Sequence, residues 1–233
     1  GPIAGWDVSR VDDMSLLFLS KTTFNDDIGA WDTSQVTNML QTFWSAEAFN
    51  SELAWDTSKV TNMGKAFDKA SAFNQALEWD TSRVTNMNSV FVAASSFNQP
   101  GISAWDVSKV TMMSGTFQNA KAFNSELAWD TSSVATMTAT FFRATAFNRQ
   151  LAWDTSKVTN LHTAFHTAEA FNSQLVWDTS KVTSVWQTFY GAEKFNKALA
   201  WDTSSVTQIL DAFNGAEAFN QPLVWDTSQV TSL

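Results

Sequence analysis

The sequence predicts an α/β fold, a solenoid of about nine to ten coils with short helices on one side and short parallel strands on the other. Two observations carry this prediction. A motif that opens with Trp-Asp recurs along the whole chain at a nearly fixed period. Within each repeat, the apolar residues first follow a helical spacing and then alternate as they do in a strand.

The period is the firmest feature of the chain. Seven of the nine spacings between motif tryptophans are 24 residues, one is 25 and one is 26. Because a repeat array grows by adding coils, we expect residues 1–233 to form a single unit. Both ends fall inside a repeat, so we expect this unit to be an excerpt of a longer array. The repeats begin at Trp6, Trp31, Trp55, Trp79, Trp105, Trp129, Trp153, Trp177, Trp201 and Trp225.

The first half of each repeat carries the helical spacing. In the third repeat Val60, Met63 and Phe67 are three and then four residues apart, and the other repeats keep this spacing. Such residues share one face of a helix of about two turns. Thr61 and Asn62 stand where side-chain oxygens cap the first turn of a helix.

The second half of each repeat carries the strand pattern. Leu77 and Trp79 are two residues apart, so an extended chain points both to the same side. We therefore expect a strand of about three to five residues in each coil. Neighbouring strands of a parallel sheet would lie about 4.8 Å apart.

These residues also carry a family resemblance. The phrase Trp-Asp-Thr-Ser-Lys-Val-Thr-Asn-Met, followed at fixed offsets by Phe, Ala and Phe-Asn-Gln, resembles the bacterial surface repeat known as the BspA-like or DUF285 repeat. The resemblance covers essentially the whole chain. It implies a right-handed solenoid like that of leucine-rich repeats, a surface or secreted location and a role in adhesion. It supplies no catalytic residues.

Composition excludes several classes of function. The net charge is −9, and only 14 Lys and Arg are spread over the chain, which disfavours nucleic-acid binding. No apolar run is long enough to insert into a membrane as a helix. The chain has no Cys, so thiolate metal sites and disulfides are excluded. We expect no cofactor.

Three polar positions repeat with the period. The Asp after each Trp predicts an Asx turn, supported by a basic residue three positions on, although calcium bound between coils is the alternative. The Asn after the second Phe is expected to bond backbone groups of the neighbouring coil. The Thr two residues after Trp, with another four residues later, leaves ice binding as a minor alternative, because turn and cap roles explain the hydroxyls.

Residues for catalysis are scarce. His162 and His166 are four apart, but two histidines without a third ligand make a weak zinc site. No glycine-rich phosphate loop and no nucleophile elbow stands out from the repeat. We therefore expect a protein that is not an enzyme and that holds no metal.

The residues that break the repeat are the candidate binding site. The position after the first Phe of each repeat should face outwards, yet it holds aromatic rings in three consecutive repeats, with further rings one helical turn earlier. Such rings suit protein interfaces or glycan stacking, or they widen the core. The candidate residues are Phe142, His162, His166, Trp186 and Tyr190.

The sequence thus predicts a surface or secreted repeat protein that binds a protein or glycan partner. A self-assembling scaffold, which associates through its ends or faces, is the leading alternative, because the open ends of a solenoid expose unpaired strand edges. Calcium binding and ice binding remain minor alternatives.

Overall fold

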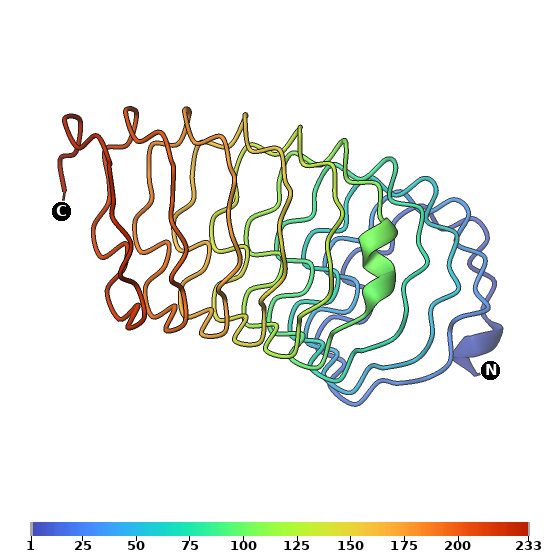
Figure 1. The fold of residues 1–233 in the computed structure, drawn as a ribbon. Helices are drawn as coiled ribbons and strands as arrows, with labels where there is room; N and C mark the ends of the chain where they lie inside the picture. The colour runs from blue at the N-terminus through green and yellow to red at the C-terminus, as the bar shows by residue number, and fades with distance from the viewer. Residues whose placement is uncertain (1, 233) are drawn as a thin grey trace.

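The structure is a computed structural model that describes residues 2–232, and it is a stack of chain turns (Figure 1). Equivalent residues of successive turns are joined by nine parallel β-bridges, from Asp13 with Asn38 to Gln208 with Ser232. Each turn therefore corresponds to one repeat. We call the turns coils and number them by their opening tryptophan, from coil 1 at Trp6 to coil 10 at Trp225.

The expected α/β architecture is wrong. Within residues 2–232 the only helices are two short 3₁₀ segments, η1 at Ile3–Gly5 and η2 at Pro100–Ala104. The β-bridges are isolated pairs that do not extend into strands. The second 3₁₀ segment lies in the 26-residue repeat, where Pro100 opens it with the backbone angle that a first helical position requires.

The first half of each coil is a run of turns instead of a helix. In coil 3 the amide of Ala66 donates to the carbonyl of Met63, and the amide of Asp68 donates to that of Lys65. Lys65 and Lys69 have positive φ angles of 55° and 60°, and the equivalent residues of coils 1–9 share this conformation. A positive φ at the third residue of a turn is what a type II turn requires, and it cannot continue an α-helix.

Backbone hydrogen bonds between coils replace the helical ones. The amide of Phe67 donates to Val90 of the next coil at 2.9 Å, whereas a helix would direct it to Met63. The amides of Met63, Lys65 and Lys69 make the same kind of bond. We call the positions equivalent to residues 61–69 the ladder side.

The second half of each coil alternates in burial but does not pair. The side chains of Leu77 and Trp79 are buried, and Glu78 between them is exposed. Within the described residues, no backbone hydrogen bond joins one coil to the next at the positions equivalent to residues 75–80. We call these positions the open side. The expected parallel strands are therefore absent there. The coil-to-coil backbone bonds lie on the ladder side, which was assigned to helices, and at the positions equivalent to Ala72.

The spacing between stacked rings also differs between the ladder side and the open side. Equivalent rings in successive coils are nearly parallel, so the distance between their centroids follows the spacing of the coils. This distance is 5.2–5.8 Å for the first Phe of each repeat and 5.7–6.2 Å for the second. It reaches 6.1–6.5 Å for the motif Trp on the open side. The stacked rings on the open side are thus spaced more widely than those of the first Phe, whose backbone pairs with the next coil.

Side chains bridge the wide gap. The indole Nε1 of each motif Trp in coils 2–8 donates to a backbone carbonyl 26–28 residues earlier in the chain, at 2.8–3.3 Å. The Thr two residues later, where present, donates its hydroxyl to the Asp carbonyl of the next coil, as Thr57 does to Asp80 at 2.9 Å.

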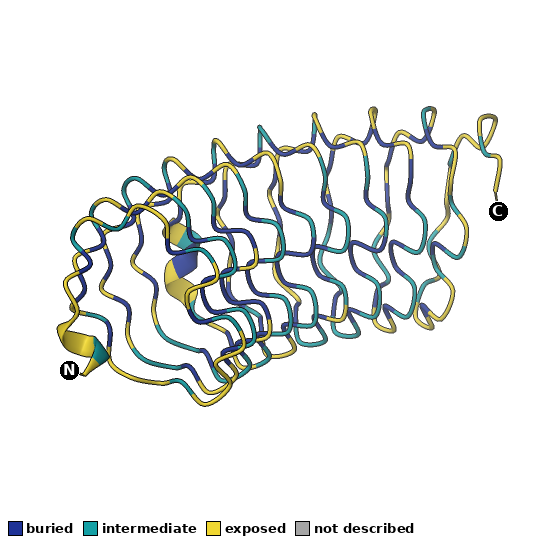
Figure 2. Cartoon of the chain, turned by 180° about the vertical axis from the view of Figure 1, so that it is seen from behind, coloured by how far each residue is buried: buried dark blue, intermediate teal, exposed yellow. Residues whose placement is uncertain are grey.

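The core is one continuous cluster of buried side chains that takes residues from coils 1–9, and Figure 2 shows buried segments in successive coils along the stack. The largest fully buried side chains are all phenylalanines, such as Phe43, Phe49 and Phe67. A single coil could not bury these faces, so each coil depends on its neighbours. Within the described residues, no helix has the length and apolar character needed to cross a membrane.

Candidate functional site

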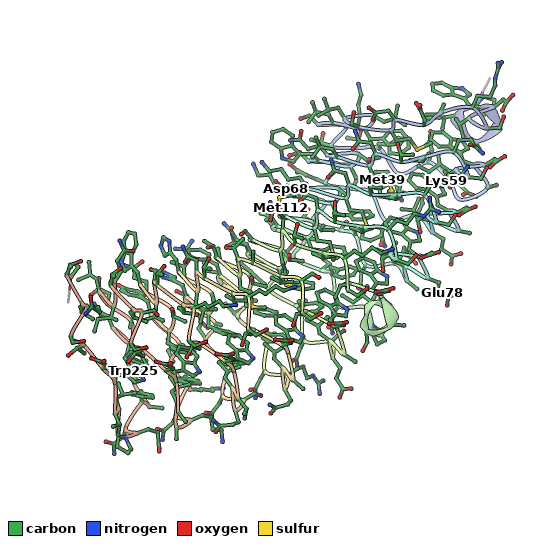
Figure 3. All side chains as sticks on the ribbon, turned by 90° about the horizontal axis from the view of Figure 1, so that it is seen from above. Met39, Lys59, Asp68, Glu78, Met112 and Trp225 are labelled. Carbon is green, nitrogen blue, oxygen red and sulfur yellow. The ribbon has the colours of Figure 1, made fainter. Side chains whose placement is uncertain are left out.

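Two rows of side chains break the repeat on the ladder side. In coil 3 they are the positions of Gly64 and Asp68, and each row takes one residue from every coil. Asp68 lies across the stack from Glu78 of the open side (Figure 3). We call the two rows the Gly64 row and the Asp68 row. Over coils 1–9 the Asp68 row reads Leu19, Trp44, Asp68, Val92, Gln118, Phe142, His166, Tyr190 and Asn214.

The structure brings the predicted residues together as two stacks. In the Asp68 row, the His166 ring lies between Phe142 and Tyr190, with centroids 4.6 Å from each and planes within 14°. In the Gly64 row, the rings of His162 and Trp186 are 4.3 Å apart. The stacked rings come from coils 6, 7 and 8, although the helix that was expected to carry them is absent.

These stacks present ring edges outwards, because most ring faces are covered. All five side chains are partly buried. Both faces of His166 are occupied by its neighbours, and the guanidinium carbon of Arg143 is 5.2 Å from the Phe142 centroid. Since His166 occupies one face of Phe142, Arg143 covers the other. A sugar ring needs a free aromatic face, so Phe142 and His166 are not available for glycan stacking.

The two histidines are neutral at neutral pH. Burial lowers the pKa of His162. Burial also lowers the pKa of His166, and the charges of Arg143 and His162 lower it further. Within residues 2–232, no group of three or more His, Cys, Asp or Glu side chains is placed to hold a metal ion.

Sequence reasoning missed a second cluster on the same face. In coils 2 and 3, the Lys65 ammonium lies 5.7 Å from the centroid of the Trp44 ring. Asp68, the next residue of the row after Trp44, is only 7% exposed. Burial raises the pKa of Asp68, while Lys65 and Lys69 oppose the rise. A tryptophan outside the motif position was the sequence signal that could have identified this cluster, and that tryptophan is Trp44. The same signal identifies Trp186.

Unpaired polar atoms gather on this face. Six buried side-chain nitrogen or oxygen atoms of the described residues lack a hydrogen-bond partner. Two are indole nitrogens of the motif, in Trp201 and Trp225. The other four all lie in the two rows, and they are Trp44 Nε1, Asp68 Oδ1, His166 Nδ1 and Trp186 Nε1. Because unpaired buried polar atoms are rare, their concentration here needs an explanation.

The repeating Asp forms the expected Asx turn. In all ten coils its Oδ1 accepts a hydrogen bond from the amide of the Ser two residues on, at 2.8–3.1 Å, as Asp56 does from Ser58. The hydroxyl and amide of Ser58 lower the pKa of Asp56, and Lys59 contributes to a smaller extent. One carboxylate oxygen per coil is thus engaged by its own turn.

The repeating Asn serves the backbone, as the sequence predicted. Its Oδ1 accepts from the amide of the Asn in the next coil, at 2.7–3.0 Å in all eight steps from Asn25 to Asn220. Of the two Thr positions, the one equivalent to Thr57 is buried in every coil that carries it except coil 10, so this row cannot contact ice. The one equivalent to Thr61 is exposed, and its hydroxyl donates to the preceding coil.

Comparison with known families places the chain. The family described as "Mycoplasma protein of unknown function, DUF285" matches residues 1–78, 53–152, 77–176, 127–199 and 175–233. Because these overlapping matches tile the whole sequence, the chain belongs to the DUF285 family. A comparison with curated proteins found no match.

Proposed function

We propose that the chain is a binding protein without catalytic activity, displayed on a cell surface or secreted, which engages a protein partner through the Gly64 and Asp68 rows. One observation carries the proposal. Every Trp, Phe, Tyr and His that lies outside the repeating core positions stands in these two rows, namely Trp44, Phe142, His162, His166, Trp186 and Tyr190. Aromatic side chains are enriched at protein interfaces because they contribute large contact area at low entropic cost.

The scarcity of charged side chains supports the same face as the binding surface. The positions equivalent to residues 64–69 carry only five charged side chains over coils 1–9, and these are Lys65, Asp68, Lys69, Arg143 and Asp211. The protein as a whole is acidic, with a net charge of −9. Depletion of charge together with aromatic residues and Arg is the composition of an interface core.

The test is a comparison of partner capture by matched variants. The double variant Trp186→Ala and Tyr190→Ala should lose the partner that the wild-type protein captures from surface-protein extracts after chemical cross-linking. The control is Val176→Ala and Val224→Ala, which removes the same kind of apolar area from the open side, where these residues are 83% and 93% exposed. Equal capture by both double variants would contradict the proposal.

A scaffold that self-associates is the second candidate, and the exposed row on the open side favours it. The position before each motif Trp is exposed in coils 1–9, and it holds Ala or Val in every one except coil 3, where it is Glu78. Exposed apolar rows favour association. Light scattering over a wide concentration range should show growth in mass that Val176→Ser with Val224→Ser abolishes. A constant mass of 25.8 kDa would rule this candidate out.

A further inference from the structure

On the ladder side of coils 6–8, Arg143 is the charged side chain, and it is exposed. The Arg143 guanidinium and the Trp186 indole can only donate, and Trp186 Nε1 lacks an acceptor. The Arg143 guanidinium makes no hydrogen bond to another described residue and is held only by its contact with the Phe142 ring. Because Trp186 Nε1 is buried, the exposed Arg143 guanidinium is the donor that an acceptor on a partner can reach.

This patch on the ladder side of coils 6–8 has no negative charge. The 18 residues of coils 6–8 that are equivalent to residues 64–69 include no Asp and no Glu, although the chain contains 23. The next coil contributes Asp211, which accepts a long hydrogen bond of 3.4 Å from Gln187. The protein as a whole carries net negative charge, so an approaching acidic group meets less repulsion at the ladder side of coils 6–8 than elsewhere.

We infer that coils 6–8 bind a carboxylate-bearing segment of the protein partner, with Arg143 as the ionic contact and the stacked rings as the apolar surface beside it. A planar guanidinium binds a carboxylate with two parallel hydrogen bonds, and its present stacking on Phe142 leaves its edge free for this contact. The inference rests on the proposed function, and it adds which chemical group of the partner the binding face recognises.

A lower pH should strengthen the binding of a carboxylate to this patch. The groups that face the His166 ring are Phe142 and Arg143 from coil 6, His162 from its own coil and Tyr190 from coil 8, and none of them is acidic. His162 faces Trp186. Both histidines gain their proton only below their ordinary pKa of about 6.5, because burial lowers their pKa. A bound carboxylate favours the protonated form, so affinity should rise as pH falls from 7.5 towards 5.5.

The experiment uses two fluorescein-labelled peptides that differ only in charge, one with a Leu-Glu-Leu-Glu core and one with Leu-Gln-Leu-Gln. Fluorescence anisotropy at low salt should show the acidic peptide bound about tenfold more tightly, the difference that one charge-assisted hydrogen bond supplies. Arg143→Gln should abolish that preference. Trp186→Ala should weaken both peptides, because the apolar surface is shared.

The matched control is Arg149→Gln, in the same coil but on the open side. It changes net charge by the same one unit. Gln75 and Gln99 stand at the equivalent position of coils 3 and 4, and each donates to the Asn carbonyl of the preceding coil that is equivalent to the one Arg149 contacts. This variant should bind like the wild type. Equal loss in both Arg variants would show a nonspecific charge effect and overturn the inference.

The remaining outcomes of the peptide experiment also test the inference. If neither peptide binds, or both bind equally, the inference is wrong, and the proposed function stands as long as Trp186→Ala with Tyr190→Ala still abolishes partner capture. If an oligogalacturonate binds in an Arg143-dependent way and the acidic peptide does not, the patch selects an acidic glycan and the inference is overturned.

Discussion

The two sides of each coil hold the stack together by different means. On the ladder side, backbone amides such as that of Phe67 reach the next coil directly. On the open side, motif rings are 6.1–6.5 Å apart, and indole, hydroxyl and amide side chains span the gap. The outer rings of the ladder side are only 4.3–4.6 Å apart. The spacing between stacked rings therefore increases towards the motif tryptophans, and the stability of the open side depends on particular side chains.

The largest expected effect is the loss of an open-side tryptophan. Trp105 is 4% exposed, stacks on Trp79 and Trp129, and donates to the Leu77 carbonyl at 3.1 Å. Trp105→Ala should lower the free energy of unfolding by about 3–5 kcal/mol, since it leaves a cavity in the core. Trp105→Phe keeps a ring and should cost less. Guanidinium denaturation measures both, and equal midpoints for the wild type and Trp105→Ala would contradict a dependence on tryptophan.

Hydrogen exchange compares the two sides directly. The side chains of Phe67 and Leu77 are both fully buried, but the Phe67 amide donates to Val90, whereas the Leu77 amide donates to no described residue. The Leu77 amide should therefore exchange at least about a hundredfold faster, because protection follows the hydrogen bond rather than side-chain burial. Residue-resolved exchange by NMR provides the measurement. Similar protection at both amides would show that the open side is paired after all.

An Asn of the repeating row should matter nearly as much as a core residue. The Oδ1 of Asn98 accepts from the Asn124 amide at 2.8 Å and from the Ser125 hydroxyl at 2.9 Å. Asn98→Ala leaves both donors unpaired and should destabilise the protein by about 1–3 kcal/mol. Asn220→Ala serves as the control, because Asn220 accepts from no described residue. If the two variants unfold at the same denaturant concentration, the row does not hold the coils together.

The buried Thr of the open side should contribute less. Thr57→Val keeps the shape of the side chain and removes one hydrogen bond to Asp80, so it should cost about 0.5–1.5 kcal/mol. Coils 1 and 5 already carry Val8 and Val107 at this position. The reverse change Val107→Thr restores the bond and should stabilise the protein by a similar amount or less. Thermal unfolding would measure both, and a stabilising Thr57→Val would contradict the bridging role.

The smallest effect is a pH dependence on the ladder side. Because burial lowers the pKa of His166, its contribution to stability is complete above the ordinary value of about 6.5 and is lost as pH falls below it. His166→Phe keeps a ring between Phe142 and Tyr190 and removes the titration. The thermal midpoint of this variant should therefore fall less between pH 7 and pH 5 than that of the wild type. If the thermal midpoints of the two proteins depended on pH in the same way, a group other than His166 would be responsible.

Sequence patterns identified the rows correctly but assigned the wrong local structure to both halves of the coil. The spacing of Val60, Met63 and Phe67 fits a helix, yet a chain of tight turns gives the same inward faces. The positive φ angles that distinguish the two occur at non-glycine residues such as Lys65, Gln41 and Ala139. Only Gly115, Gly191 and Gly215 signal this conformation in the sequence.

The candidate site was found in part for the same reason. Phe142, His166 and Tyr190 align because they share a position in the repeat, whatever structure that position adopts. The contact of Arg143 with Phe142, and the burial of Asp68 beside Lys65, depend on side-chain directions that only the folded chain sets. A period states which residues share a row, but it does not state which atoms are covered.

The sequence by itself determined the period, the alignment of equivalent residues, the Asp turn and the Asn row, because these depend on spacing along the chain and on local hydrogen bonds. Only the tertiary structure decided which side of the coil pairs. Backbone hydrogen bonds join successive coils at Phe67, but not at Trp79, where the distance between stacked rings is larger. That difference in spacing arises from the packing of neighbouring coils, and a single repeat does not contain it.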